Sequence, residues 1–144
     1  MGAGLMPSGL SVTQDAYEQM IAHCQRDYPR EACGLLAGRG NAASKPYSMR
    51  NVEESPISYQ MDPKEQLTVM KRMRQADEQM LAIYHSHTAS AAYPSPVDVR
   101  FAVYPDVSYV VVSLVDRQRP EVRSFRIVEG RISEEDLRVS GERL

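Results

Sequence analysis

Three side chains that commonly bind transition metals occur close together in the second half of the chain. His85 and His87 lie two residues apart in a run that predicts a β-strand, so both imidazoles would point to the same face of a sheet. Asp98 follows after a loop and the start of a helix, and it would add a carboxylate. Two nitrogen ligands and one oxygen ligand leave a tetrahedral zinc ion one position for water, which is typical of catalytic zinc sites. We therefore predict one Zn²⁺ per chain, bound by His85, His87 and Asp98.

A zinc ion held in this way would provide a nucleophile for hydrolysis. Zinc lowers the pKa of a bound water molecule to about 7, so hydroxide becomes available at neutral pH. A general base is still needed to take up a proton and pass it to a leaving amine. Glu31, which precedes a glycine-containing apolar run, is the candidate for this base. Ser95 precedes Asp98 by three residues, and its hydroxyl could donate a hydrogen bond to the oxyanion that forms when water attacks a carbonyl.

Each of these residues also has an ordinary structural interpretation. A His-x-His pair on a strand can be two half-exposed polar residues on the outer face of a sheet. Ser95, Pro96 and Asp98 fit the start of a helix, where serine caps the helix and the aspartate lies near the positive end of its dipole. Glu31 taken alone would be a surface carboxylate, and Cys33 would be a small core residue rather than a thiolate ligand. The combination of residues therefore carries the prediction.

The combination resembles a known motif. With Glu31 upstream, the spacing of the two histidines, Ser95 and Asp98 is similar to the JAMM motif of the Mov34/MPN/PAD-1 metalloprotease family, a glutamate followed by H-x-H-x(7)-S-x(2)-D. Every position of the motif is filled at the family's spacing. Residues 29–38 also resemble the strand entry that carries the family's glutamate, and the resemblance extends over about residues 10–128.

The resemblance implies a fold, a reaction and a role for each motif residue. The fold would be a single α/β (α+β) domain, the MPN fold, in which helices flank a curved mixed sheet in a layered architecture like that of cytidine deaminases. The reaction would be zinc-dependent hydrolysis of an amide or isopeptide bond after the C-terminal tail of ubiquitin or a ubiquitin-like protein. His85, His87 and Asp98 would bind the zinc ion. Glu31 would hydrogen-bond the zinc-bound water and shuttle its proton, and Ser95 would polarise the scissile carbonyl.

Further segments narrow the expected substrate. Three of them are similar to bacterial members of the family that act with small sulfur-carrier proteins: residues 51–56, 61–66 and 85–95. The resemblance implies that the chain releases an amino acid, notably cysteine, from an adduct on a carrier partner with a Gly-Gly tail. Such a thin tail could lie extended beside Ile57 and Tyr59 as an added strand. The side chain of Tyr93 could line the position next to the cleaved bond.

Composition limits the other functions that we expect. The chain has 144 residues, of which 42% are hydrophobic and 25% are charged, as in one folded domain. Its formal net charge of -2 gives no basic excess, so we expect no nucleic-acid partner. No stretch approaches the roughly 18 apolar residues that a membrane span needs, so we expect no membrane association. Two cysteines and no signal peptide predict a cytoplasmic protein with reduced thiols.

The periodicity of apolar residues predicts the elements that must position these side chains. The expected order is β, α, β, β, α, β, α, β, β in one domain over residues 10–130, with flexible termini at 1–9 and 138–144. The predicted helices cover residues 14–28, 62–79 and 95–103. The predicted strands cover residues 33–38, 46–51, 80–85, 109–115 and 122–128, and residues 57–61 are expected to be extended.

Two helices carry more specific expectations. On the helix that starts near residue 62, Asp62 and Glu65 would form a capping box. The same helix would bury three side chains on one face: Leu67, Met70 and Met73. His23, on the first helix, would be exposed to solvent.

Three other functional classes remain as alternatives. A non-catalytic module could grip a ubiquitin-like tail around a structural metal, but it would need neither an open ligand position nor Glu31. A zinc deaminase would need H-x-E followed by P-C-x-x-C, whereas Cys24 and Cys33 lie nine residues apart. A DNA-repair-associated relative with a His-x-His pattern would be expected to have a basic excess. The sequence therefore favours a hydrolase.

Overall fold

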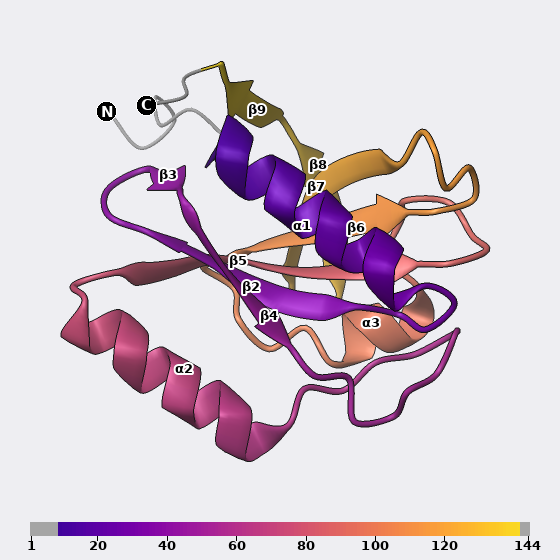
Figure 1. Cartoon of the computed structure of the whole chain (residues 1–144), viewed down its shortest axis with the longest axis horizontal. Coiled ribbons are helices and arrows are strands. Elements are labelled where there is room, and N and C mark those ends of the chain that lie inside the picture. Colours follow the sequence, from indigo (N-terminus) through magenta and orange to yellow (C-terminus); the bar gives the residue numbers. More distant parts are fainter. Residues whose placement is uncertain (1–8, 142–144) are drawn as a thin grey trace.

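Two β-sheets form the framework of the chain (Figure 1). The computed structural model describes residues 9–141. The larger sheet has the strand order β4-β2-β5-β6-β7-β8, and its neighbouring strands are antiparallel except for the parallel pair β5 and β6. The smaller sheet has the order β3-β1-β9 and is parallel. The strands are β1 Leu10–Thr13, β2 Cys33–Gly38, β3 Ala42–Ala43, β4 Lys45–Met49, β5 Gln79–His87, β6 Ser108–Ser113, β7 Glu121–Val128, β8 Arg131–Glu135 and β9 Leu137–Ser140.

Helices cover both faces of the larger sheet, as the sequence predicts for a mixed α/β domain. The helices are α1 Gln14–Asp27, α2 Pro63–Gln75 and α3 Pro96–Arg100. The second and third helices end earlier than predicted, because residues 76–78 form a turn before β5 and the third helix stops at Arg100. Residues 57–61 are not a strand, since the pairing there is a single bridge between Asn51 and Met61.

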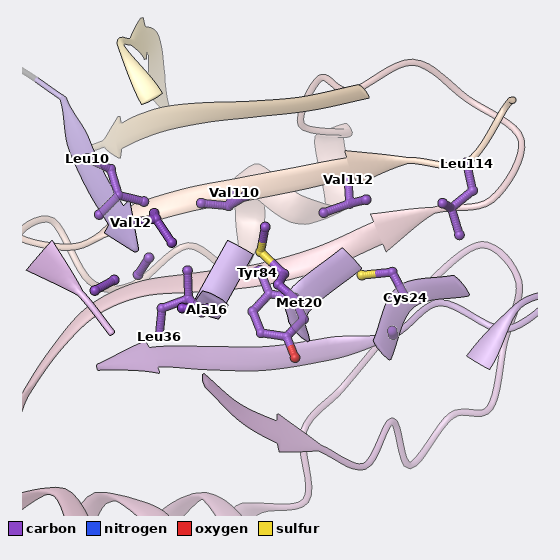
Figure 2. Packing of buried hydrophobic residues seen from close by; sticks show 13 residues of the cluster. Leu10, Val12, Ala16, Met20, Cys24, Leu36, Tyr84, Val110, Val112 and Leu114 are labelled. Carbon is purple, nitrogen blue, oxygen red and sulfur yellow. The ribbon is translucent and has the colours of Figure 1, made fainter. Parts of the chain in front are cut away.

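The first helix packs on one face of the larger sheet. Its buried residues Ala16, Met20 and Cys24 recur at four-residue steps and form one stripe. Figure 2 shows this stripe gathered with Leu36 of β2 and Tyr84 of β5. These contacts make one of the two large apolar clusters of the domain.

The close approach of Tyr84 explains a glycine and corrects one prediction. A Cβ atom on Gly34 would lie 2.3 Å from the Tyr84 ring, so only glycine fits there without displacement. The Tyr84 hydroxyl lies 2.6 Å from Nδ1 of His23, and Nε2 of His23 lies 3.1 Å from Asp27. His23 is therefore buried, and the prediction that it is exposed was wrong. Its partner Tyr84 is distant in sequence, so the local pattern around His23 gave no sign of it.

The second and third helices lie on the opposite face, where they form the second apolar cluster. Val69 and Met73 of α2 are buried there with Leu35 of β2 and Tyr109 of β6. The prediction for this helix was right for Met73 but wrong for Leu67, which is 64% exposed. Val69 lies four residues before Met73, so the two side chains share one face of the helix. The buried stripe therefore runs through Val69 instead of Leu67.

The predicted capping box at the start of α2 forms only in part. The side chain of Asp62 accepts a hydrogen bond from the Lys64 amide at 3.0 Å, as an N-cap does. Glu65 instead accepts a hydrogen bond from the Arg50 amide at 2.8 Å. This contact ties the start of the helix to the chain that follows β4.

The C-terminal strands extend the domain beyond the predicted boundary at residue 130. The strand β8 pairs with β7, and the strand β9 pairs with β1. Residues 138–140, which were expected to be flexible, thus lie in a strand that pairs with β1. The short β9 alternates half-buried apolar side chains, Leu137 and Val139, with exposed polar ones, and its pairing partner β1 lies at the other end of the chain. The expected flexibility of residues 1–8 and 142–144 concerns segments outside the described residues. No helix within residues 9–141 is long and apolar enough to span a bilayer.

Candidate active site

The pairing of β2 with β5 places Glu31 and the two histidines on one face of the sheet. The Ser86 amide donates a hydrogen bond to the Ala32 carbonyl at 3.0 Å, and the Ala32 amide donates to Ser86 Oγ at 2.8 Å. These bonds continue the antiparallel register of the two strands and set Glu31 opposite His87. Because side chains alternate along a strand, Glu31, His85 and His87 face the side that carries α2 and α3.

The start of α3 brings Asp98 to the histidines. The Asp98 amide donates a hydrogen bond to Ser95 Oγ at 3.0 Å, and the Ser95 amide donates to Asp98 Oδ2 at 2.8 Å. This capping box fixes the aspartate side chain and confirms the capping interpretation of Ser95 and Asp98, and it leaves Asp98 Oδ2 next to the histidines. Ser95 Oγ accepts in this contact, and its own O–H remains able to donate.

Three side-chain atoms converge on one point at this site. The Nε2 atoms of His85 and His87 each lie 3.0 Å from Asp98 Oδ2 and 3.1 Å from one another. Ligands placed 2.0–2.1 Å from a tetrahedral zinc ion would be about 3.3 Å apart. The three atoms are therefore close to the spacing that a single ion requires, and the group could hold a metal. Both histidines are buried and the Asp98 side chain is 11% exposed.

The hydrogen-bonding chemistry of the three residues also fits a cation. His87 Nδ1 lies 2.9 Å from the Ala91 carbonyl, so this nitrogen carries the hydrogen. In the neutral imidazole, Nε2 then presents its lone pair to Asp98 Oδ2. Two acceptors at 3.0 Å repel one another unless a proton or a metal ion lies between them. A backbone carbonyl on the distal nitrogen is also a common partner of metal-binding histidines.

Burial and the contacts within the group set its protonation. Burial lowers the pKa of His85. Burial also disfavours the charged form of His87, but its hydrogen bonds to Asp98 and Ala91 outweigh burial and raise its pKa. For Asp98, burial acts to raise the pKa, yet the hydrogen bonds from the two histidines hold that pKa far below its usual range. Asp98 is therefore anionic, as a carboxylate ligand must be.

Glu31 is a buried carboxyl group next to this cluster. Its side chain is 5% exposed, so the alternative interpretation as a surface carboxylate was wrong. Burial raises its pKa to about 8, while His87 acts to lower this pKa and Asp98 acts to raise it further. Within residues 9–141, the buried side-chain atoms without a hydrogen-bond partner are Glu31 Oε1 and His85 Nδ1, and both lie at this site. A carboxyl group with a pKa near neutrality can both accept and release a proton.

A groove with a volume of about 410 Å³ reaches Asp98. The loop before α2 contributes Tyr59 to its lining, and the ring of Tyr59 stacks on His85 with centroids 4.6 Å apart. Three apolar side chains from α3 and the segment after it also line the groove, and sequence analysis missed them: Val97, Phe101 and Val103. Phe101 and Val103 are 70% and 69% exposed. The sequence alone did not mark them, because their exposure depends on where the third helix ends, and residues 95–103 were predicted to form one helix.

The other predicted contact residues lie outside the groove lining. Ile57 is 84% exposed, on the same loop as Tyr59. Tyr93 is 49% exposed and packs edge-on against Phe125, with ring centroids 5.4 Å apart. Cys33 is buried in the core, and its thiol contacts the Met49 carbonyl rather than the metal-ligand group.

Known proteins resemble the chain over most of its length. A curated relative from Mycobacterium tuberculosis, named CysO-cysteine peptidase, is 47% identical over 132 residues, which cover 90% of each chain. A second relative, from Thermus thermophilus, is named probable TtuB-protein conjugate cleaving protease. It is 35% identical over 135 residues, covering 90% of this chain and 86% of that protein.

A solved structure shares the fold. The solution structure of a protein from Desulfitobacterium hafniense superposes with a TM-score of 0.83 at 39% sequence identity, covering 92% of this chain and 94% of that one. The family described as prokaryotic homologs of the JAB domain matches residues 13–128, a range that contains the glutamate, both histidines, the serine and the aspartate of the motif. The resemblance drawn from the motif is thereby confirmed, and the chain belongs to the family of prokaryotic homologs of the JAB domain.

Proposed function

We propose that the chain is a zinc-dependent peptidase that cleaves the amide bond joining an adduct to the C-terminal tail of a small ubiquitin-like or sulfur-carrier protein. A cysteine adduct is the substrate that we favour, because the relative of 47% identity is named CysO-cysteine peptidase. The observation that carries the proposal is the convergence of His85, His87 and Asp98 beside the buried Glu31, whose Oε1 has no hydrogen-bond partner within residues 9–141. The predicted cytoplasmic location stays a prediction.

The ligand set gives each residue of the site a task. His85 and His87, through Nε2, and Asp98, through Oδ2, would hold the ion. When bound, Zn²⁺ acts as a Lewis acid and lowers the pKa of a bound water molecule to about 7. His87 is oriented for this task by the Ala91 carbonyl, and Asp98 by the Ser95 amide.

The remaining groups would manage protons and charge during hydrolysis. Glu31 would take a proton from the attacking water at Oε1 and deliver it to the nitrogen of the leaving amine. The water oxygen forms a bond to the carbonyl carbon, and the carbon–nitrogen bond breaks. Ser95 would donate its O–H to the carbonyl oxygen as negative charge develops there. The products are a carrier with a free carboxylate and an amino acid with a free amine.

The groove beside Asp98 offers a place for the carrier tail. A Gly-Gly terminus has no side chains, so it can pass close to the stacked Tyr59 and His85 rings to reach the site. Apolar side chains further along the tail would contact Phe101 and Val103, which are otherwise largely exposed. Contacts of the partner with Ile57 and Tyr93 stay predictions.

A cleavage assay tests the proposed function. The substrate is a small carrier protein ending in Gly-Gly that carries cysteine in amide linkage, and mass spectrometry follows the loss of the cysteine. We expect the zinc-loaded wild type to release cysteine, and Glu31→Gln to retain zinc but lose at least about 100-fold in kcat. A wild type that binds the adduct without cleaving it would support the non-catalytic module instead. Full activity in Glu31→Gln would show that another group is the base.

A further inference from the structure

Asn51 is a buried side chain whose hydrogen-bonding capacity is fully used. It is 7% exposed. Its Nδ2 donates to the carbonyl oxygens of Glu31 and Ser58, each at 3.0 Å. Its Oδ1 accepts from the amides of Glu53 and Gln60, also each at 3.0 Å. An asparagine amide has two donor hydrogens and two acceptor lone pairs, so these four partners fix its orientation.

The four partners tie one loop to the active site. The loop of residues 52–60, which we call the Asn51 loop, has no regular secondary structure. Its ends are joined by the hydrogen bond from the Val52 amide to the Gln60 carbonyl at 2.8 Å. Further along, the Glu31 amide donates to the Ser55 carbonyl at 2.8 Å, and Thr88 Oγ1 donates to the Pro56 carbonyl at 2.8 Å. The loop therefore depends on Asn51 at its base and contacts the site at two points along its length.

This arrangement holds two groups of the candidate site through one side chain. The backbone of Glu31 is held on both sides, since its amide donates into the Asn51 loop and its carbonyl accepts from Asn51. Tyr59 belongs to the same loop and lies between the Asn51-bonded residues Ser58 and Gln60. Its ring stacks on His85 at an interplanar angle of 25°. Loosening the Asn51 loop would thus free the carboxylate and the ring together.

We propose that Asn51 is a positioning residue, which holds Glu31 and Tyr59 against the His85–His87–Asp98 cluster through the loop that it organises. Its effect on cleavage rests on the proposed function, but its effect on the loop does not. The motif does not include this residue, and Asn51 is neither one of the three candidate ligands nor a residue that lines the groove. It does hydrogen-bond three backbones of the groove lining, those of Glu53, Ser58 and Gln60. The residue acts through the backbone, so only an amide of this size satisfies all four partners.

The variants are chosen to separate positioning from general stability. Asn51→Ala removes all four hydrogen bonds. Asn51→Asp keeps the size and both accepted bonds but loses the donors to Glu31 and Ser58, so it serves as a second test if the alanine variant does not fold. The matched control is Tyr47→Phe. It removes the 2.7 Å hydrogen bond from the hydroxyl of Tyr47, on β4, to Glu78, and neither residue belongs to the Asn51 loop.

Amide hydrogen exchange of the metal-free chain, followed by NMR, tests the loop directly. In Asn51→Ala we expect exchange at the Glu31, Val52 and Gln60 amides to rise roughly 10- to 100-fold, with no comparable change in Tyr47→Phe. In Asn51→Asp the Glu31 amide should exchange faster, while Gln60, whose acceptor remains, should change less. Unchanged exchange at Glu31 and Gln60 in both variants would overturn the proposal.

Kinetics on the cysteine adduct test the consequence for the site. We expect Asn51→Ala to bind one zinc per chain and to lose about 10- to 100-fold in kcat, with a smaller change in KM. A loss no larger than that of Tyr47→Phe would overturn the positioning role and leave Asn51 as a structural residue. If the wild type itself does not cleave the adduct, the proposed function fails. The exchange rates at Glu31 and in the loop then still decide whether Asn51 holds them.

Discussion

Replacing Glu31 with glutamine should stabilise the metal-free chain at alkaline pH and change it little at acidic pH. Glutamine has nearly the same shape as glutamate but does not ionise. Glu31 is 5% exposed, and its Oε1 has no hydrogen-bond partner within residues 9–141. The ionised form is therefore disfavoured in the folded chain, whereas an unfolded chain exposes the carboxylate to water.

The magnitude follows from the pKa of this carboxyl group. Burial raises that pKa from 4.5 to about 8. Below pH 4.5 both folded and unfolded chains hold the proton, and Glu31 does not reduce stability. Between pH 4.5 and 8 the unfolded chain binds fewer protons than the folded chain, so the free energy of unfolding falls as pH rises. At 1.36 kcal/mol per pH unit, the loss of unfolding free energy above pH 8 reaches at most about 5 kcal/mol.

Urea unfolding in the presence of a chelator measures this difference. We expect Glu31→Gln to exceed the wild type by roughly 2–5 kcal/mol at pH 8.5 and by less than about 1 kcal/mol at pH 5. Glu121→Gln, at an exposed carboxylate on β7, should match the wild type at both pH values. Titratable groups away from the site cancel in the comparison, whereas the charge on Glu31, which acts to raise the pKa of His87, is also lost in Glu31→Gln. Equal stability of Glu31→Gln and wild type at pH 8.5 would refute the burial of an unpartnered carboxylate at this position.

Three further substitutions probe the elements that surround the site. Ser95→Ala removes the cap on the Asp98 amide, so urea unfolding should show a free energy of unfolding lower by about 0.5–2 kcal/mol. The same variant should have a lower kcat in the cleavage assay, and unchanged activity would remove Ser95 from the proposed mechanism. Gly34→Ala should lower stability by about 1–3 kcal/mol, because the new methyl group would lie 2.3 Å from the Tyr84 ring, and an unaltered Tm would contradict this close approach. Tyr93→Ala should weaken turnover of the carrier adduct while leaving zinc content unchanged, and identical kinetics would place Tyr93 outside the substrate site.

The sequence indicated directly that His85, His87 and Asp98 would lie together, but it indicated the edges of the fold less well. His85 and His87 share a face because strand periodicity is strict, and Asp98 is oriented by a capping box that depends on residues three apart. Both features are local, so their spacing could be read directly. The burial of Glu31 and its place opposite His87 depend on the register between β2 and β5, which no local pattern encodes.

The errors share the same physical origin. His23 is buried because Tyr84 meets it across the core, and the two residues are 61 positions apart. The strand β9 forms because it pairs with β1 from the other end of the chain, which half-buries its Leu137 and Val139. Leu67 is exposed because the sheet is contacted by the stripe of Val69 and Met73 instead. In each case a contact between distant segments decided the outcome.

Zinc content measured by mass spectrometry, after equilibration with Zn²⁺ and removal of loose metal, tests the central claim most directly. The three converging atoms of His85, His87 and Asp98 predict close to one zinc per chain in the wild type and in Glu31→Gln, and almost none in His87→Ala. His23→Gln alters the third histidine of the chain, which contacts Tyr84 on the α1 side of the sheet, and this variant should retain the metal. A wild type without zinc, or a His87→Ala variant that holds as much zinc as the wild type, would contradict the proposed metal site and the peptidase built on it.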